Sequence, residues 1–86
     1  MAVHDNVERI REARGVTKTY IASKIGLSLQ GYRHKASGNC KMDVEELKIL
    51  AFALCVDVSI FFDDELTDSV IKKISNIGNR QVGKTG

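Results

Sequence analysis

The sequence predicts an all-α fold, one compact domain of four or five helices with an extra C-terminal helix, on three observations. Apolar residues recur three or four positions apart, which is the spacing of one helix face. Strand-forming residues do not alternate with polar ones over any useful length, and the chain contains no proline. Its 86 residues can bury one modest core and leave little room for a second domain.

Residues that favour helix ends delimit the first three helices. Gly15 supplies a left-handed cap after the first apolar stripe, and Thr17 is a good N-cap for the second helix. Gly26 stops the second helix, and Ser28 caps a third that runs to about Ser37. The residues expected to face the core are Val7, Ile10, Ala13, Ile21, Ala22, Ile25, Leu27 and Tyr32.

The second half of the chain carries similar signals. Asp43 opens a fourth helix, with Glu46 three residues later as its capping-box partner. A short helix or turn covers residues 58–62, and Thr67 is the expected N-cap of a last helix. We expect a main domain over 1–65, a C-terminal helix over 66–77 for packing or dimerisation, and a flexible tail over 78–86. The inward residues expected here are Val44, Leu47, Leu50, Ala51, Leu54, Val70, Ile71, Ile74 and Ile77.

Charge is unevenly distributed along the chain. Residues 1–41 hold eight basic and three acidic residues, residues 42–68 hold one basic and eight acidic residues, and residues 69–86 hold four basic residues and no acidic one. A basic first half is what a phosphate-facing surface requires, although charge runs are also common on ordinary solvated helix faces.

The compartment is inferred from what the sequence lacks. No charged leader with an apolar stretch precedes the first helix, and the longest apolar run, Ile49 to Val56, is too short for a membrane span. The two cysteines, Cys40 and Cys55, do not make a disulfide framework. We therefore expect a reducing, cytoplasmic setting with no membrane partner.

The segment from Lys18 to Ser37 is the most informative. Two short helices that meet near a right angle need a small side chain at their closest approach, and Ala22 stands there. The turn between them needs a positive φ or little bulk, and Gly26 satisfies this requirement.

With these residues the chain resembles the Cro and phage-repressor (XRE-like) helix-turn-helix family over about residues 6–63. The resemblance implies a lambda-repressor-like domain that binds double-stranded DNA sequence-specifically, usually as a homodimer on a near-palindromic operator, and so regulates transcription, most often by repression. It also suggests a bacterial source or a phage or mobile element. The residues that carry it are Ile10, Arg11, Arg14, Gly15, Val16, Thr17, Ile21, Ala22, Lys24, Ile25, Gly26, Leu27, Ser28, Gly38, Leu47, Leu50, Ala51, Ala53, Leu54, Val56, Ile60, Phe61 and Phe62.

The resemblance also implies which residues contact DNA. The base-contact candidates on the reading helix are Ser28, Leu29, Gln30, Arg33 and His34. The phosphate-contact candidates are Lys18, Ser37 and Lys41. Glutamine pairs bidentately with adenine and arginine with guanine, whereas phosphate contacts fix the register without reading sequence.

The reading helix departs from the family pattern at three positions. Lys35 stands where the family has an apolar residue, and its stem is expected to cover the core while the ammonium reaches solvent. Ala36 replaces a glutamate, which leaves Arg11 without its usual partner, and Gly31 lies inside the helix. Two explanations remain open: a reading helix that becomes firm only on DNA, or a domain whose DNA surface has been lost.

Other chemistry has weak support. His4, His34, Cys40 and Cys55 lack the close spacing of zinc ligands, and Cys55 is expected to be buried or half-buried. Residues 78–85 match the Walker A pattern, but a P-loop follows a strand and precedes a helix, so we expect no nucleotide binding. We expect no cofactor, no metal and no enzymatic activity, because so small a core leaves no pocket for acid–base groups.

Two apolar strips have no assigned partner in the sequence. They consist of Ile49, Phe52 and Val56 on the fourth helix, and Leu66, Val70, Ile74 and Ile77 on the last helix. Either one strip covers the other within a chain, or both build a two-fold dimer. The alternative function is a protein-interaction regulator, of the antitoxin or anti-repressor type, that binds a partner through these strips with weak or no DNA binding.

Overall fold

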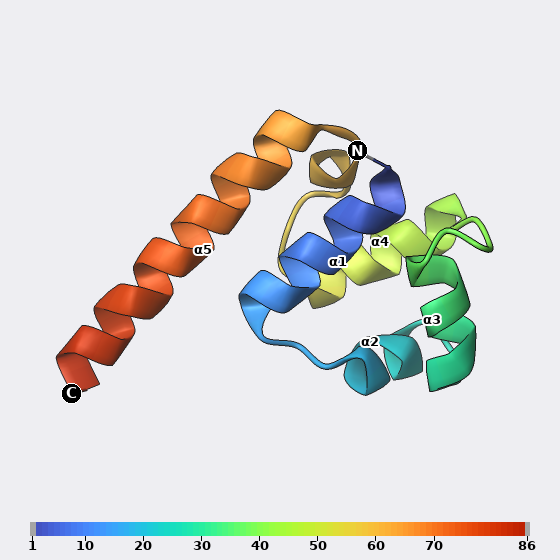
Figure 1. The fold of residues 1–86 in the computed structure, drawn as a ribbon, viewed down its shortest axis with the longest axis horizontal. Coiled ribbons are helices and arrows are strands. Elements are labelled where there is room, and N and C mark those ends of the chain that lie inside the picture. Colours follow the sequence, from blue (N-terminus) through green and yellow to red (C-terminus); the bar gives the residue numbers. More distant parts are fainter. Residues whose placement is uncertain (1, 86) are drawn as a thin grey trace.

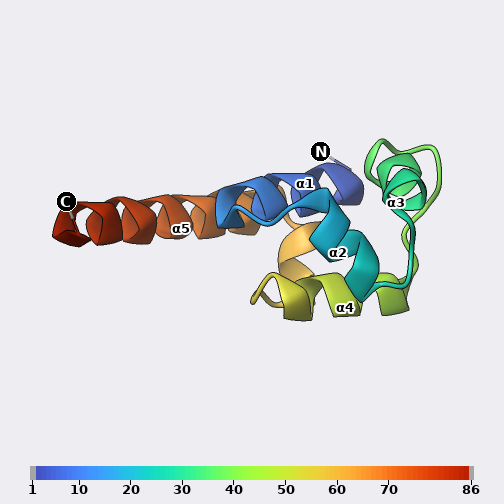
Figure 2. The ribbon, with the colours of Figure 1, turned by 90° about the horizontal axis from the view of Figure 1, so that it is seen from below.

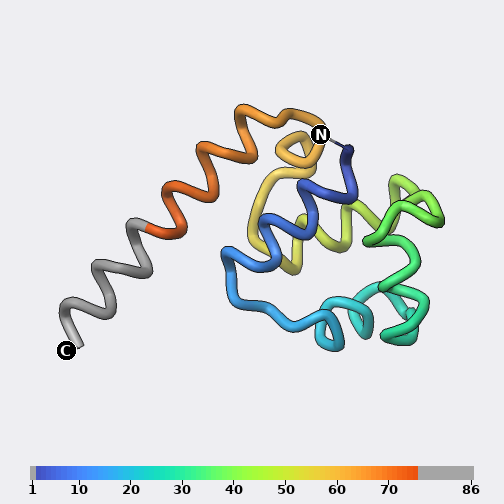
Figure 3. The backbone as a smooth tube through the Cα atoms, in the orientation of Figure 1, coloured from blue at the N-terminus to red at the C-terminus, as the bar shows by residue number. Residues whose placement is uncertain are grey.

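The computed structural model describes residues 2–85 in backbone and residues 2–75 in side chains. Figure 3 traces the backbone and colours the part over residues 2–75. Over this range the chain forms helices and no strands, so the predicted all-α class is confirmed. The elements are α1 (Val3–Arg14), α2 (Lys18–Lys24), α3 (Leu29–Ala36), α4 (Val44–Ala53), the 3₁₀ helix η1 (Val58–Phe62) and α5 (Asp64–Thr85). No helix among the described residues combines the length and apolar character needed to cross a bilayer.

Helices α1 to α4 and η1 surround one core (Figure 1). Helix α1 crosses the middle of the body, α2 and α3 lie together at one end, and α4 packs beneath them in the view of Figure 2. The buried apolar side chains are Val7, Ile10, Ile21, Ala22, Tyr32, Leu47, Leu50, Ala51, Leu54 and Phe61. Helices α1 to α4 and η1 all contribute to this core, and Val70 and Ile71 of α5 pack against it. The core therefore holds α2 and α3 in a fixed orientation.

The predicted helix starts agree with the structure at three local caps. Thr17 Oγ1 accepts a hydrogen bond from Tyr20 N at 3.1 Å, and Ser28 Oγ accepts one from Gly31 N at 3.1 Å. The capping box of α4 forms in both directions between Asp43 and Glu46. Each cap satisfies backbone N–H groups that the first helical turn leaves without partners.

The predicted cap of the last helix is wrong. Asp63 Oδ1 accepts hydrogen bonds from Glu65 N at 2.9 Å and Leu66 N at 3.1 Å, so α5 begins at Asp64. Thr67 is instead fully buried within α5, and its hydroxyl donates to Ile60 O at 2.6 Å. Thr67 lies in the first turn of α5, and its hydroxyl links α5 to η1.

Two residues near the ends of α4 also differ from expectation. Val44, predicted to face the core, is exposed at the first position of α4. Cys55, predicted to be buried or half-buried, is exposed and has a φ of +59°. Cys55 occupies the left-handed position after α4 that reverses the chain direction, and the Arg14 side chain donates to Leu54 O at 3.0 Å beside it.

Helix α5 packs against α1 and η1 rather than along α4 (Figures 1 and 2). Asn6 Nδ2 donates to Phe61 O at 2.9 Å and to Asp64 Oδ1 at 3.0 Å, and Arg9 forms an ion pair with Asp68. The α5 strip therefore does not cover the α4 strip, and Phe52 remains 87% exposed. The expected dimer residue Ile77 and the expected tail over 78–86 lie beyond the described side chains.

Candidate nucleic-acid interface

The turn between α2 and α3 has the geometry that the sequence predicted. Gly26 has a φ of +71°, which side chains rarely tolerate, and Leu27 N donates to Ala22 O at 2.9 Å to close the turn. Ala22 and Ile21 are buried at the base of this unit. Figure 2 shows α3 nearly end-on at the edge of the body.

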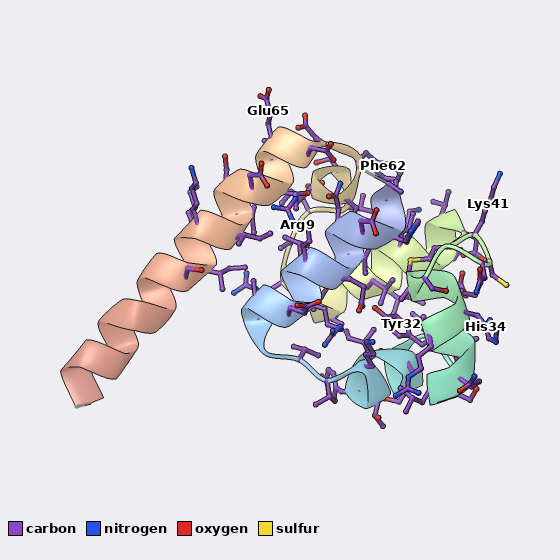
Figure 4. All side chains as sticks on the ribbon, in the orientation of Figure 1. Arg9, Tyr32, His34, Lys41, Phe62 and Glu65 are labelled. Carbon is purple, nitrogen blue, oxygen red and sulfur yellow. The ribbon has the colours of Figure 1, made fainter. Side chains whose placement is uncertain are left out.

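Tyr32 anchors α3 to the core and thereby determines which face of the helix meets solvent. The Tyr32 side chain is fully buried. With a rotation of about 100° per residue, Gln30 and His34 lie on the side opposite Tyr32, and Arg33 lies at the edge of that side. All three are exposed, and Figure 4 shows His34 pointing outward from α3.

These exposed side chains line one shallow hollow of about 230 Å³. Its walls are Gln30, Arg33, His34, Ser37 and Asn39. The structure thus brings together four of the eight predicted contact residues. It adds Asn39, which the sequence analysis missed because it lies after the helix-ending Gly38, where only the folded loop returns it to α3.

The other base-contact candidates are placed differently. Ser28 is exposed, but its hydroxyl oxygen is occupied as the N-cap of α3. Leu29 is half-buried in the first turn of α3. Neither residue lines the hollow, so the centre of the candidate surface lies one turn later than the resemblance implied.

The three phosphate-contact candidates do not form one group. Ser37 lines the hollow, and its hydroxyl donates to His34 O at 3.0 Å. Lys18 lies at the start of α2 with its Nζ atom 3.9 Å from Glu8 Oε1, so part of its charge is already balanced. Lys41 lies in the loop after α3 beside a different cavity.

Arg11 has a partner that the sequence analysis did not foresee. Its Nε and Nη2 atoms donate to the two carboxylate oxygens of Glu8 at 2.9 and 3.1 Å, and Nη1 donates to Val16 O at 2.6 Å. The Tyr32 hydroxyl donates to Glu8 Oε2 at 2.6 Å. Ala36 leaves Arg11 without the glutamate that the resemblance implies, but Glu8, one turn earlier on α1, supplies a carboxylate partner instead.

The pKa values within this cluster follow from its contacts. Burial alone raises the pKa of Glu8, but hydrogen bonds from Arg11 and Tyr32 outweigh it, and the net pKa lies below the ordinary value. The hydrogen bond to Glu8 raises the pKa of Arg11. Burial, followed by the bond to Glu8, raises the pKa of the Tyr32 phenol. At neutral pH the Glu8 carboxylate and the Arg11 guanidinium are therefore charged and the Tyr32 phenol is neutral, and the cluster joins α1 to α3.

Lys35 has two partners that the sequence analysis did not foresee. Its Nζ atom donates to Glu46 Oε1 at 2.8 Å and to Lys41 O at 3.1 Å. The bond to Glu46 raises the pKa of Lys35. The ion pair links α3 to the capping box of α4, so this departure from the family pattern has a structural role.

The electrostatic character of the surface follows from its composition. Residues 13–42, which include α2, α3 and both flanking turns, contain no Asp or Glu. Lys24 lies with its Nζ atom 4.9 Å from the centre of the Tyr20 ring, a cation–π contact on the exposed side of α2. The acidic residues lie elsewhere in the chain, so a phosphate backbone can approach α2 and α3 without meeting a carboxylate of these elements.

Within the side chains that the structure describes, no three His, Cys, Asp or Glu residues are grouped as metal ligands. The Walker A match over residues 78–85 falls outside that range. No family model, no curated protein and no solved structure matches this chain. The resemblance to the Cro and phage-repressor family therefore stays a prediction from the sequence.

Proposed function

We propose that this protein binds double-stranded DNA by inserting α3 into the major groove and thereby regulates transcription, as a repressor. The observation that carries the proposal is the exposed face of α3, where Gln30, Arg33 and His34 line one hollow on a unit without carboxylates. An α-helix with its side chains is about 10–12 Å in diameter, which fits a major groove about 12 Å wide.

Four of the five residues that line the hollow have an assigned role in this proposal. The Gln30 amide pairs with the N6 and N7 atoms of adenine, and the Arg33 guanidinium pairs with O6 and N7 of guanine. Asn39 donates to a phosphate oxygen at the end of α3, and the Ser37 hydroxyl does so by exchanging His34 O for the phosphate, so that both set the depth of insertion. Lys18 reaches the backbone at the start of α2 once phosphate competes with Glu8 for its ammonium.

Two copies would place two α3 helices in successive major grooves about 34 Å apart. The exposed apolar edge of α4, with Ile49 and the 87% exposed Phe52, supports self-association. The remaining dimer candidates Val56, Val70 and Ile74 are half-buried within the chain, which centres the proposed contact on Phe52. Sedimentation velocity should show a dimer for the parent chain and a monomer for Phe52→Ser, whereas a parent chain that is monomeric at high micromolar concentration contradicts this part of the proposal.

Selection of bound duplexes from a random pool tests DNA binding itself. The expected result is an enriched motif with two-fold symmetry, bound with an affinity that falls steeply between low and high salt as counterions are released. Failure to enrich any duplex, or binding that ignores salt concentration, refutes the proposal.

Variants of the hollow then test the assignment of residues. Arg33→Ala and Gln30→Ala should each weaken binding by about 5- to 150-fold, because a bidentate base contact contributes about 1–3 kcal/mol. Lys48→Gln removes a lysine from the exposed side of α4 and serves as the control with unchanged base preference. If Arg33→Ala and Lys48→Gln behave alike while the parent chain captures a protein through α4, the interaction-regulator alternative replaces the proposal.

A further inference from the structure

A second cavity lies between the start of α1, the loop that joins α3 to α4, and η1. Its volume is about 230 Å³. An apolar wall is formed by Val3, Met42, Leu47 and Phe62. A cavity of about 150 Å³ is sufficient to hold benzene, so this one has room for a six-membered ring with a small substituent.

The polar part of the wall carries no negative charge. It includes the imidazole of His4, the thiol of Cys40 and Lys41. The Asp5 carboxylate lies 3.5 Å from His4 Nε2, and Asp5 does not line the cavity. The other ring nitrogen of His4, Nδ1, can carry a ring N–H, and the Lys41 ammonium stands at the end of a flexible stem.

The wall is shaped by a close packing contact. Gly38 has a φ of +89°, and a Cβ atom built on it would lie 2.8 Å from His4 Cε1. The His4 ring therefore lies against the backbone of the loop. This contact joins α1 to the α3–α4 loop beside the cavity. Phe62 completes the rim and remains 59% exposed despite its size. Figure 4 shows Phe62 and Lys41 extending from the same side of the molecule.

We propose that this cavity binds a small organic monoanion with an apolar body, of the size and charge of an aromatic carboxylate. The ring would lie against Phe62, Met42 and Val3, and the carboxylate would face Lys41 and the His4 N–H. A ligand of this kind matches both the apolar and the polar part of the wall. Moving its ring out of water lowers the free energy, and so does placing its carboxylate beside the lysine ammonium. The proposal concerns the free protein and is independent of DNA binding.

The first test is an NMR titration of the full chain with sodium benzoate, followed through backbone amide shifts. We expect saturable shifts of Val3, Gly38 and Lys41, with a dissociation constant on the order of 1 mM for so small a molecule. Benzamide, which keeps the ring without the charge, and acetate, which keeps the charge without the ring, should each bind at least severalfold more weakly. Benzoate shifts that do not saturate by roughly ten times that concentration, or benzamide that binds as well as benzoate, overturn the proposal.

Matched variants locate the site. Phe62→Ala should weaken benzoate binding, whereas Leu66→Ala, which removes an exposed apolar residue outside the cavity, should not. Lys41→Gln should weaken it about threefold to fivefold, and Lys48→Gln should leave it unchanged. Lys41 is exposed, so its variant tests the site even if Phe62→Ala fails to fold. Equal benzoate affinity in Lys41→Gln and Lys48→Gln overturns the assignment.

Discussion

Replacing Glu8 by Gln tests whether the cluster of Glu8, Arg11 and Tyr32 stabilises the fold. The carboxylate accepts three hydrogen bonds, two from Arg11 at 2.9 and 3.1 Å and one from Tyr32 at 2.6 Å. Glutamine keeps one acceptor oxygen and no charge, and its amide N–H groups face the Arg11 donors. A hydrogen bond to a charged group contributes about 1.5–3 kcal/mol, so losing one to two of them should lower the free energy of unfolding by about 2–3 kcal/mol.

The burial of Glu8 and Arg11 supports the expected loss of unfolding free energy. The Glu8 and Arg11 side chains are only 16% and 11% exposed, so water replaces the lost partners poorly. Urea denaturation followed by circular dichroism measures the effect, and the melting temperature should fall by roughly 10–20 °C for a chain of this size. Glu12→Gln is the control, because Glu12 is 70% exposed and 3.8 Å from Arg11, and it should change the stability little. A Glu8→Gln variant as stable as Glu12→Gln refutes the reasoning.

The same variant predicts a dependence on pH. Because the pKa of Glu8 is lowered on folding, its contribution to stability is complete above the unfolded-state pKa and is lost as the pH falls through the folded value. The difference in unfolding free energy between the parent chain and Glu8→Gln should therefore be full at pH 7 and should shrink as the pH falls below about 4. A difference that is constant from pH 7 to pH 3 contradicts the charged state assigned to Glu8.

Three further substitutions probe the backbone and α5. Gly31→Ala should raise the melting temperature, because the residue is helical, the new Cβ meets nothing closer than 3.4 Å, and alanine favours a helix by about 1 kcal/mol; a lower melting temperature contradicts this. Gly38→Ala should lower stability by about 1–3 kcal/mol, because its φ is +89° and the His4 ring is in the way, and a neutral result would refute that contact. Thr67→Val should lower the free energy of unfolding by about 1–2 kcal/mol in chemical denaturation, because it removes the donor to Ile60 O. Thr67→Ser keeps this donor and should keep most of the stability of the parent chain.

Helix starts were predictable from the sequence where the signal is local. The side-chain oxygens of Thr17, Ser28 and Asp43 all bond to a backbone N–H three residues ahead. Such a bond depends on the identity of one residue and on a helix following it, and both are visible in the sequence. Thr67 was misassigned because Asp63, four residues earlier, offered a competing cap, and the sequence alone did not rank the two.

Candidate site residues were predictable to the extent that they share one helix face. Gln30, Arg33 and His34 are exposed together because Tyr32 is buried, and helical geometry then fixes their side. Asn39 was missed, because its place beside α3 depends on the path of the loop after Gly38. The proposed monoanion cavity also could not be predicted from the sequence, because Val3 and Phe62 line one cavity only when α1 and η1 pack together.

By itself, the sequence determined the helical class, the caps of α2, α3 and α4, and the small residues of the α2–α3 turn, because these depend on neighbours within a few positions. Only the tertiary structure decided which charged and polar side chains meet across helices. Tyr32 of α3 joins Glu8 of α1, and Lys35 of α3 joins Glu46 of α4, across helices whose relative positions are set by the shared core. Local propensity carries no information about such pairs, since helix spacing relates only residues within one helix.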